Sequence, residues 1–252
     1  MATSFGALCT DFYVNQKLAL KLDLPGDRET VLHLFEQVRK AEPTMSRFRR
    51  YNNELALESS RRDPSYRWLA IRRNSIRTGN VNPETMEQAF HFHKRILELA
   101  PYHMTISPLD LDYIELLFGF ELECKANHDE VVFEALIGDA PVANLIKMPN
   151  AEHPRILDVQ PIFGISLSKS GDLQAYFEVK TRTRSRRGRT SRTRNEPIGL
   201  LLTVRKYGPV QRLDDLQEEF EVLRQHCETL ATERLVPLML TPIARQITSS
   251  SA

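Results

Sequence analysis

The chain has 252 residues, of which 41% are hydrophobic and 27% charged, and its formal net charge at pH 7 is +1. Such a composition is that of an ordinary globular protein, long enough for one large domain or two of about 125 residues each. No apolar run approaches the roughly 20 residues of a membrane-spanning helix, and the first residues lack the pattern of a signal peptide. Three scattered cysteines, Cys9, Cys124 and Cys227, fit reduced thiols. We therefore expect a soluble cytoplasmic protein with no membrane contact.

The first half of the chain is predicted to contain strands and two helices. In chain order, the segments are a strand over 12–23, a helix over 28–40, a hairpin made by 49–59 and 66–77, and a helix from about 84 to 99. Asp27 can cap the first helix, whose face is formed by Val31, Leu34, Phe35 and Val38. Trp68 falls at strand spacing and is predicted to lie in the core.

The second half repeats much of this order. Its predicted segments are a strand over 111–123, a helix over 130–136, a hairpin made by 162–168 and 173–185, a strand over 198–207, and a long helix from about 213 towards 247 with a break at Pro237. Gly119 lies inside a strand, which indicates a bulge or a point of close packing.

Residues 66–99 and 198–230 have the same organisation: an apolar strand ending in two basic residues, a Gly/Pro turn and a long amphipathic helix. This similarity predicts an internally duplicated β-α-β-β(-β)-α unit, with halves at 1–107 and 108–252. The fold class would be α+β, with antiparallel sheet packed by helices on one face. In element order this resembles the duplicated saddle of the TATA-binding-protein fold. A helix-grip fold is the alternative arrangement.

Four strings along the chain carry a resemblance at the level of sequence. They are YRWLAIRRNSIRTGNVNP, YIELLFGFELE, NHDEVVFEAL and PIGLLLTVRKYG. Together they resemble a family of conserved bacterial proteins of unknown function. The resemblance implies no activity, cofactor or catalytic residue.

Positive charge is concentrated in two places. Residues 180–194 contain eight basic residues and no acidic one, which leaves 26 basic against 33 acidic residues elsewhere. These eight are the candidate binding residues: Lys180, Arg182, Arg184, Arg186, Arg187, Arg189, Arg192 and Arg194. A second basic region in the first half is expected to extend the same surface through Arg47, Arg49, Arg50, Arg67, Arg72, Arg73 and Arg77.

Period-two alternation from 173 to 186 places the cations on one face of a strand, and Gly188 suits a turn. We expect a protruding two-stranded arm with arginines along one face. Such an arm could bind nucleic acid through its phosphates, contact an acidic protein surface or another subunit, or serve as a solvated loop. A homodimer is expected, with the arm as an element for exchange between subunits.

Combinations of residues that could support catalysis or bind a metal are weak. His91 and His93 lie about 200° apart on a helix, and His128-Asp129-Glu130 belongs to a helix start. Glu115, Glu121 and Glu123 share one face of a strand, where solvent exposure accounts for them.

No sequence pattern for a nucleotide loop, a catalytic serine or a zinc site is present. The sequence favours a binding or assembly protein without cofactor or metal over an enzyme. The alternative is a small-molecule binder or an enzyme with a pocket between the sheet and the long helix.

Overall fold

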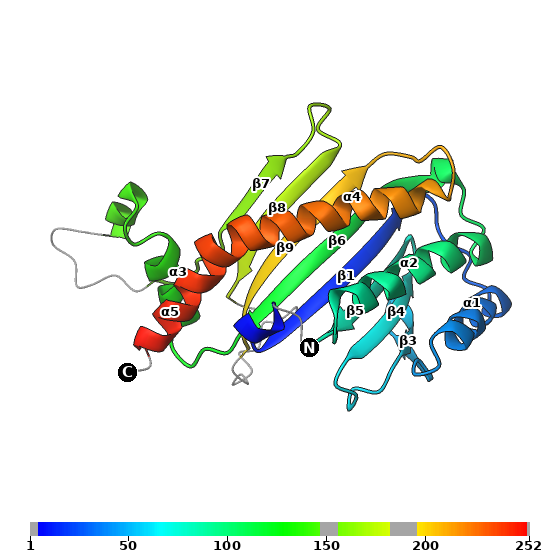
Figure 1. Cartoon of the computed structure of the whole chain (residues 1–252), viewed down its shortest axis with the longest axis horizontal. Helices are drawn as coiled ribbons and strands as arrows, with labels where there is room; N and C mark the ends of the chain where they lie inside the picture. Colours follow the sequence, from blue (N-terminus) through cyan, green and yellow to red (C-terminus); the bar gives the residue numbers. More distant parts are fainter. Residues whose placement is uncertain (1–4, 147–155, 182–195, 251–252) are drawn as a thin grey trace.

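The computed structural model describes residues 5–146, 156–181 and 196–250. Within these residues the protein is built on one nine-stranded antiparallel sheet, in the order β2-β3-β4-β5-β1-β6-β9-β8-β7 (Figure 1). The strands are β1 (Asp11–Leu20), β2 (Arg47–Tyr51), β3 (Glu54–Glu58), β4 (Tyr66–Arg72), β5 (Ser75–Val81), β6 (Leu111–Leu122), β7 (Ile162–Ser166), β8 (Leu173–Lys180) and β9 (Ile198–Tyr207). The predicted α+β class is confirmed.

The helices are α1 (Arg28–Ala41), α2 (Met86–His103), α3 (His128–Leu136), α4 (Asp215–Leu230) and α5 (Thr241–Ser250), with short 3-10 turns η1 (Gly6–Leu8), η2 (Pro108–Asp110) and η3 (Pro141–Ile146). The helices α2 and α4 pack on one side of the sheet, and α1 and α3 pack in turn on α2 and α5 (Figure 1). Asp27 caps α1 as predicted, accepting a hydrogen bond from the backbone N–H of Thr30. None of the helices in the described ranges is long and apolar enough to cross a membrane.

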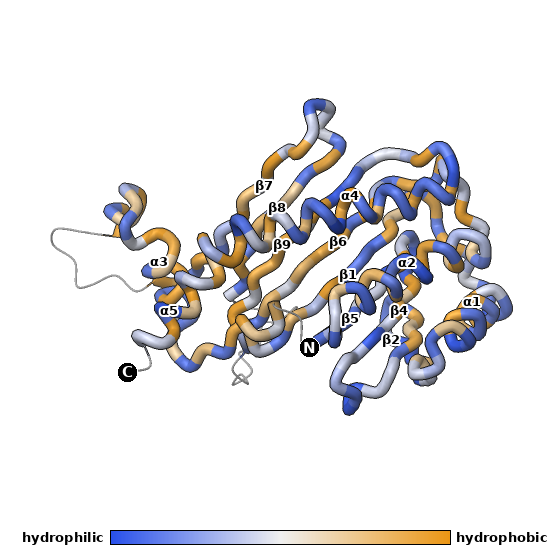
Figure 2. Tube along the Cα trace, in the orientation of Figure 1, coloured by the Kyte–Doolittle hydropathy of each residue, from blue (hydrophilic) through white to orange (hydrophobic). Residues whose placement is uncertain are grey.

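One continuous core lies between the sheet and the helices. From β1, Phe12, Val14 and Leu18 point into it, as the alternation of that strand requires. The predicted face of α1 is buried in full. In Figure 2 apolar stretches follow β6 and β9, which α4 covers. The core therefore spans the middle of the sheet, and the other side of the sheet is left without a helix in the described residues.

The last three helical segments form one continuous helix. The π-helical segment η4 (Ala231–Leu240) joins α4 directly to α5. Pro237 lies within η4, where the wider turn accommodates a residue that has no backbone N–H. The predicted break at Pro237 is thus a change of helical type and not an end of the helix.

The predicted hairpin of the first half is wrong in detail. Residues 47–58 form two strands joined at Asn52-Asn53, and residues 66–81 form two more joined at Arg73-Asn74. The unit is therefore β-α-β-β-β-β-α, with more strands than expected. Asparagine favours tight turns, because its side chain can hydrogen-bond to nearby backbone. Because the prediction used the pattern of apolar residues alone, it included neither turn.

The two halves can be compared outwards from the central pair of strands. The first runs β1-β5-β4-β3-β2 and the second runs β6-β9-β8-β7, all antiparallel. In each half the shorter helix packs on the longer one, α1 on α2 and α3 on α5, the last part of the continuous helix that begins with α4. In the described residues the second half has one strand fewer. A duplication, and a boundary between 107 and 108, remain predictions.

Candidate functional site: the helix-free face of the sheet

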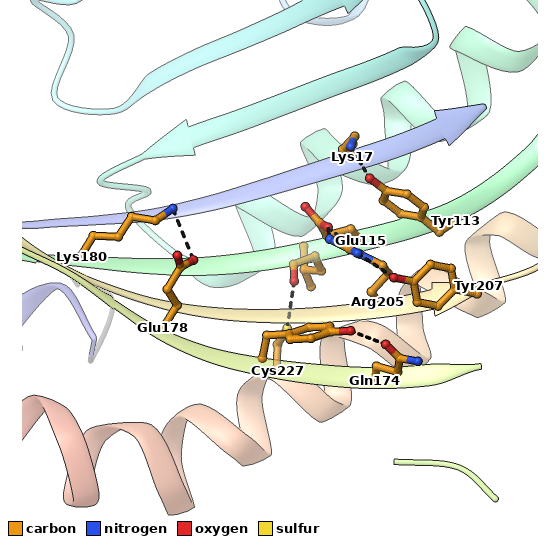
Figure 3. A network of polar contacts seen from close by, with 11 residues as sticks. Lys17, Tyr113, Glu115, Gln174, Glu178, Lys180, Arg205, Tyr207 and Cys227 are labelled. Atoms are coloured by element: carbon orange, nitrogen blue, oxygen red, sulfur yellow. Dashed lines mark hydrogen bonds and ion pairs between the residues drawn. The ribbon is translucent and has the colours of Figure 1, made fainter. Parts of the chain in front are cut away.

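The Arg-rich segment joins the sheet at the ends of two neighbouring strands. Lys180 ends β8 and is the register partner of Gly199 in β9. Its ammonium pairs with Glu178 at 3.3 Å (Figure 3). The other seven candidate residues lie outside the described residues: Arg182, Arg184, Arg186, Arg187, Arg189, Arg192 and Arg194. The protruding arm therefore stays a prediction.

The start of this segment is held by buried polar contacts. The hydroxyl of Thr181 donates to Asp129 Oδ1 at 2.7 Å, and the backbone N–H of Val159 donates to the same oxygen at 3.0 Å. Thr181 is 2% exposed and Asp129 is 1% exposed. The ring nitrogens of His128 lie 3.1 and 3.0 Å from the carbonyl oxygens of Thr181 and Cys124. Residues 128–129 thus tie α3 to Thr181, a role that the interpretation as a helix start did not include.

The arginines of the first half do not form one surface. Arg50 and Arg67 lie on the helix side of the sheet, and Arg67 forms a 2.6 Å ion pair with Glu42. Arg73 lies in a turn and pairs with Asp23. The remaining four belong to the opposite side, which we call the helix-free face: Arg47, Arg49, Arg72 and Arg77. Four of the seven arginines therefore share one face, and the predicted continuity of that face with the Arg-rich arm stays a prediction.

The strand registers define two adjacent rows of residues across the helix-free face. One row, from β4 to β7, contains Trp68, Gly79, Asn15, Leu117, Thr203, Tyr176 and Gly164. The next row, from β5 to β8, contains Arg77, Lys17, Glu115, Arg205 and Gln174. Aromatic and charged side chains from both halves of the chain therefore meet at the middle of this face.

Arg205 is at the centre of a polar network (Figure 3). Its Nε donates to Glu115 Oε2 at 2.9 Å and its Nη1 donates to Tyr207 Oη at 2.7 Å. The guanidinium also lies 4.4 Å from the centroid of the Tyr113 ring. Burial opposes the charge of Arg205, but the contacts with Tyr207 and Glu115 outweigh it and raise the pKa of the guanidinium. These contacts hold the arginine charged and in one orientation.

Arg77 and Lys17 occupy the next two places in the row. The Arg77 guanidinium lies 5.9 Å from the Trp68 ring, and burial followed by the nearby Arg72 lowers its pKa. No carboxylate in the described ranges forms an ion pair with Arg77 or Lys17, and the Lys17 ammonium donates to the Tyr113 hydroxyl. Since Glu115 is engaged by Arg205, the centre of the face carries positive charge that is not neutralised locally.

Three aromatic rings lie against glycines on neighbouring strands. A Cβ added at Gly79 would lie 2.2 Å from Trp68 Cε2, and one added at Gly119 would lie 2.1 Å from Tyr13 Cζ. At Gly164 the nearest atom would be Tyr176 Cε1, at 3.0 Å. The close packing predicted at Gly119 is confirmed. Trp68, in contrast, is half-buried on the helix-free face and not in the core as predicted.

Acidic residues gather at the end of the face where β1 begins. Glu121 is the register partner of Asp11, and burial followed by the charge of Asp11 raises the pKa of Glu121. Glu123 lies beyond the end of β6 and is exposed. Because Glu115 is held by Arg205, the three glutamates do not act as one row, and the surface is divided into a positive centre and an acidic end.

His91 and His93 of α2 lie on different faces of the helix, as their spacing predicts. His91 is exposed, whereas His93 is buried and its Nδ1 lies 2.7 Å from the Thr78 hydroxyl. That hydroxyl donates to Gln16 at 3.0 Å. In the described part of the chain, no group of three His, Cys, Asp or Glu residues could hold a metal ion.

Comparison with known proteins adds little. No family model matches the chain, and no curated protein matches it. Among solved structures, one similar chain is the di-domain aromatase/cyclase BexL from the BE-7585A biosynthetic pathway, which is 8% identical. The match covers 93% of this chain and 98% of that one with a TM-score of 0.22. A similarity this low supports no conclusion about fold or function.

Proposed function

We propose that the protein binds a polyanion, with nucleic acid as the leading candidate, through the helix-free face together with the Arg-rich segment 180–194. The single observation that carries the proposal is the central row, where Arg77, Lys17 and Arg205 lie in one line with a single carboxylate among them. Cations in such a line suit the regularly spaced phosphates of a nucleic acid backbone.

The aromatic row beside these cations supports the same ligand. Trp68 and Tyr176 are partly exposed on the helix-free face, and each lies against a glycine of the neighbouring strand. Flat aromatic side chains on an open sheet next to arginines can stack on bases of a single strand. An acidic protein surface would pair with the cations but would not stack on the aromatic rings. Nucleic acid is therefore the preferred ligand.

The packing beneath the long helix bears on the alternative, a small-molecule pocket between sheet and helix. Phe220, Leu223 and Cys227 of α4 are 0% exposed there. A cavity under the start of α4 has a volume of about 20 Å³, enough for one water molecule. A larger cleft of about 470 Å³ lies elsewhere, between α1, the β2–β3 hairpin and the β4–β5 turn. Binding at the surface is therefore favoured.

The proposal can be tested by fluorescence anisotropy with labelled duplex and single-stranded DNA at 50 and 200 mM salt. Affinity should fall with salt at about 0.9 in log–log slope per phosphate contact on duplex, and about 0.7 on single strands. Replacing Arg182, Arg184, Arg186 and Arg189 together by Gln should reduce the duplex slope by up to about 3.6.

The face itself is tested by Lys17→Gln with Arg77→Gln, which should weaken binding and reduce the slope by up to about 1.8. The matched control removes two cations from the last turn of α1, by Arg39→Gln with Lys40→Gln. Equal losses in the two pairs would point to net charge alone. Absence of binding at 50 mM salt would overturn the proposal.

A further inference from the structure

The strand β7 forms an outer edge of the sheet with no described strand beyond it (Figure 1). Its five residues are exposed, including three large apolar side chains: Ile162 at 60%, Phe163 at 58% and Ile165 at 44%. Apolar side chains project from both faces of the strand, since Phe163 and Ile165 lie on the helix side and Ile162 on the helix-free side. An edge of this kind favours pairing with another strand.

The hydrogen bonds between β7 and β8 show which backbone groups of β7 point away from the sheet. The N–H of Leu167 donates to Leu173 at 2.8 Å, and the N–H of Val179 donates to Pro161 at 3.0 Å. In an antiparallel ladder, the backbone N–H and C=O groups of every second residue point towards the paired strand. Those of Phe163 and Ile165 therefore point towards β8, as those of Leu167 and Pro161 do. The N–H and C=O groups of Ile162, Gly164 and Ser166 must then point outwards, away from the sheet.

The opposite edge of the sheet is protected differently. There β2 contains Arg47, Arg49 and Arg50 within five residues, and edge cations disfavour association between like strands. No residue of β7 is charged. The nearest charges are Asp158 before the strand and Lys169 after it. The two edges therefore differ in their capacity to pair with a copy of themselves.

We propose that β7 pairs antiparallel with β7 of a second copy of this chain, about a twofold axis at Gly164. In this register Gly164 lies opposite its own counterpart, Ile162 lies opposite Ser166, and Phe163 lies opposite Ile165. The outward backbone groups of both strands would form about six hydrogen bonds. Lys169 of one copy would lie close to Asp158 of the other, so the charges flanking the strand are complementary.

This pairing gives partners to the outward backbone groups of β7 and also places its exposed apolar side chains against those of the second copy. A twofold axis perpendicular to the sheet keeps the helices of both copies on one side, so Phe163 and Ile165 of one copy continue the helix-side surface of the other. The second copy also supplies a fifth strand to the half that has four. The flanking charges favour a second copy as the partner, since Asp158 and Lys169 complement each other when β7 pairs with itself in this register.

The test is the mass of the protein in solution, measured by light scattering after gel filtration at about 100 µM. We expect about 58 kDa, twice the 29.1 kDa of one chain. Phe163→Lys with Ile165→Lys places four cations together across the axis and should reduce the mass to that of one chain. Phe163→Glu with Ile165→Glu should do the same. The control is Leu109→Lys with Leu238→Lys, at side chains 77% and 61% exposed, and it should remain dimeric.

A mixture of the Lys and Glu variants separates a lost interface from misfolding. Equal amounts of the two should recover a dimer of about 58 kDa, because each Lys then lies opposite a Glu. A natural chain that is monomeric at 100 µM would overturn the proposal. So would a dimer that persists in both charge variants, or variants that stay folded and monomeric without recovery on mixing.

Discussion

The contact between Thr181 and Asp129 gives a prediction whose size follows from the structure. Thr181→Val keeps the shape of the side chain and removes the hydroxyl that donates to the buried Asp129 carboxyl at 2.7 Å. The N–H of Val159 remains as a donor to that carboxyl, so its hydrogen bonding is reduced and not abolished. Loss of one buried hydrogen bond to such a group costs about 2 kcal/mol in free energy of unfolding. For a chain of this length that corresponds to a decrease in Tm of about 4–8 °C.

The assay is thermal and urea unfolding followed by circular dichroism. The control is Thr203→Val, at a strand residue whose hydroxyl makes no hydrogen bond among the described residues. This substitution should change the free energy of unfolding by less than about 0.5 kcal/mol. If Thr181→Val destabilised the protein no more than Thr203→Val, the contact would not hold the start of the Arg-rich segment, and the reasoning would be refuted.

Three further predictions concern the sheet and α2. Arg205→Lys leaves one ammonium group where the guanidinium contacts both Glu115 and Tyr207. It should lower the free energy of unfolding by about 0.5–1 kcal/mol, since the pair with Glu115 is partly exposed. Urea unfolding measures this change, and an unchanged free energy of unfolding would contradict the network. Gly119→Ala places a Cβ 2.1 Å from the Tyr13 ring and should cost about 1–3 kcal/mol, a cost that should vanish when Tyr13→Ala is already present; an equal cost in both backgrounds would disprove the close packing. Burial lowers the pKa of His93 to about 3, so the unfolded state takes up a proton below about pH 6.5 while the folded state does not, and stability falls as the pH decreases through that window. Between pH 6.5 and 5.0 the natural chain should lose about 1.6 kcal/mol more than His93→Gln, and parallel pH profiles would be the contrary result.

Local patterns in the sequence predict much of this fold. The apolar pattern from Phe12 onwards identifies a strand, and the periodic face of α1 identifies both a helix and its buried side correctly. The same alternation places Trp68 with Tyr66 and Ala70, opposite Leu69 and Ile71, so its position on the helix-free face could have been found. The error came from treating a large aromatic residue as core by its type alone.

Other features depend on contacts that no local pattern contains. Thr181 and Asp129 are 52 residues apart in the chain, and they meet only because β8 ends where α3 begins. Likewise, the row of Arg77, Lys17 and Arg205 requires the order of four strands, which the sequence did not predict. The local composition showed the Arg-rich segment, but it did not show that cations from separate strands meet at the centre of the helix-free face.

The most direct test of the central claim uses Trp68, the single tryptophan of the chain. It lies half-buried on the helix-free face beside Arg77, so its fluorescence reports on ligand at that face. Titration with a single-stranded oligonucleotide at 50 mM salt should quench the Trp68 emission in parallel with the rise in anisotropy of the labelled strand, because a base stacks on the ring. Binding seen by anisotropy with unchanged Trp68 emission would place the ligand elsewhere, and it would contradict the assignment of the helix-free face as the binding surface.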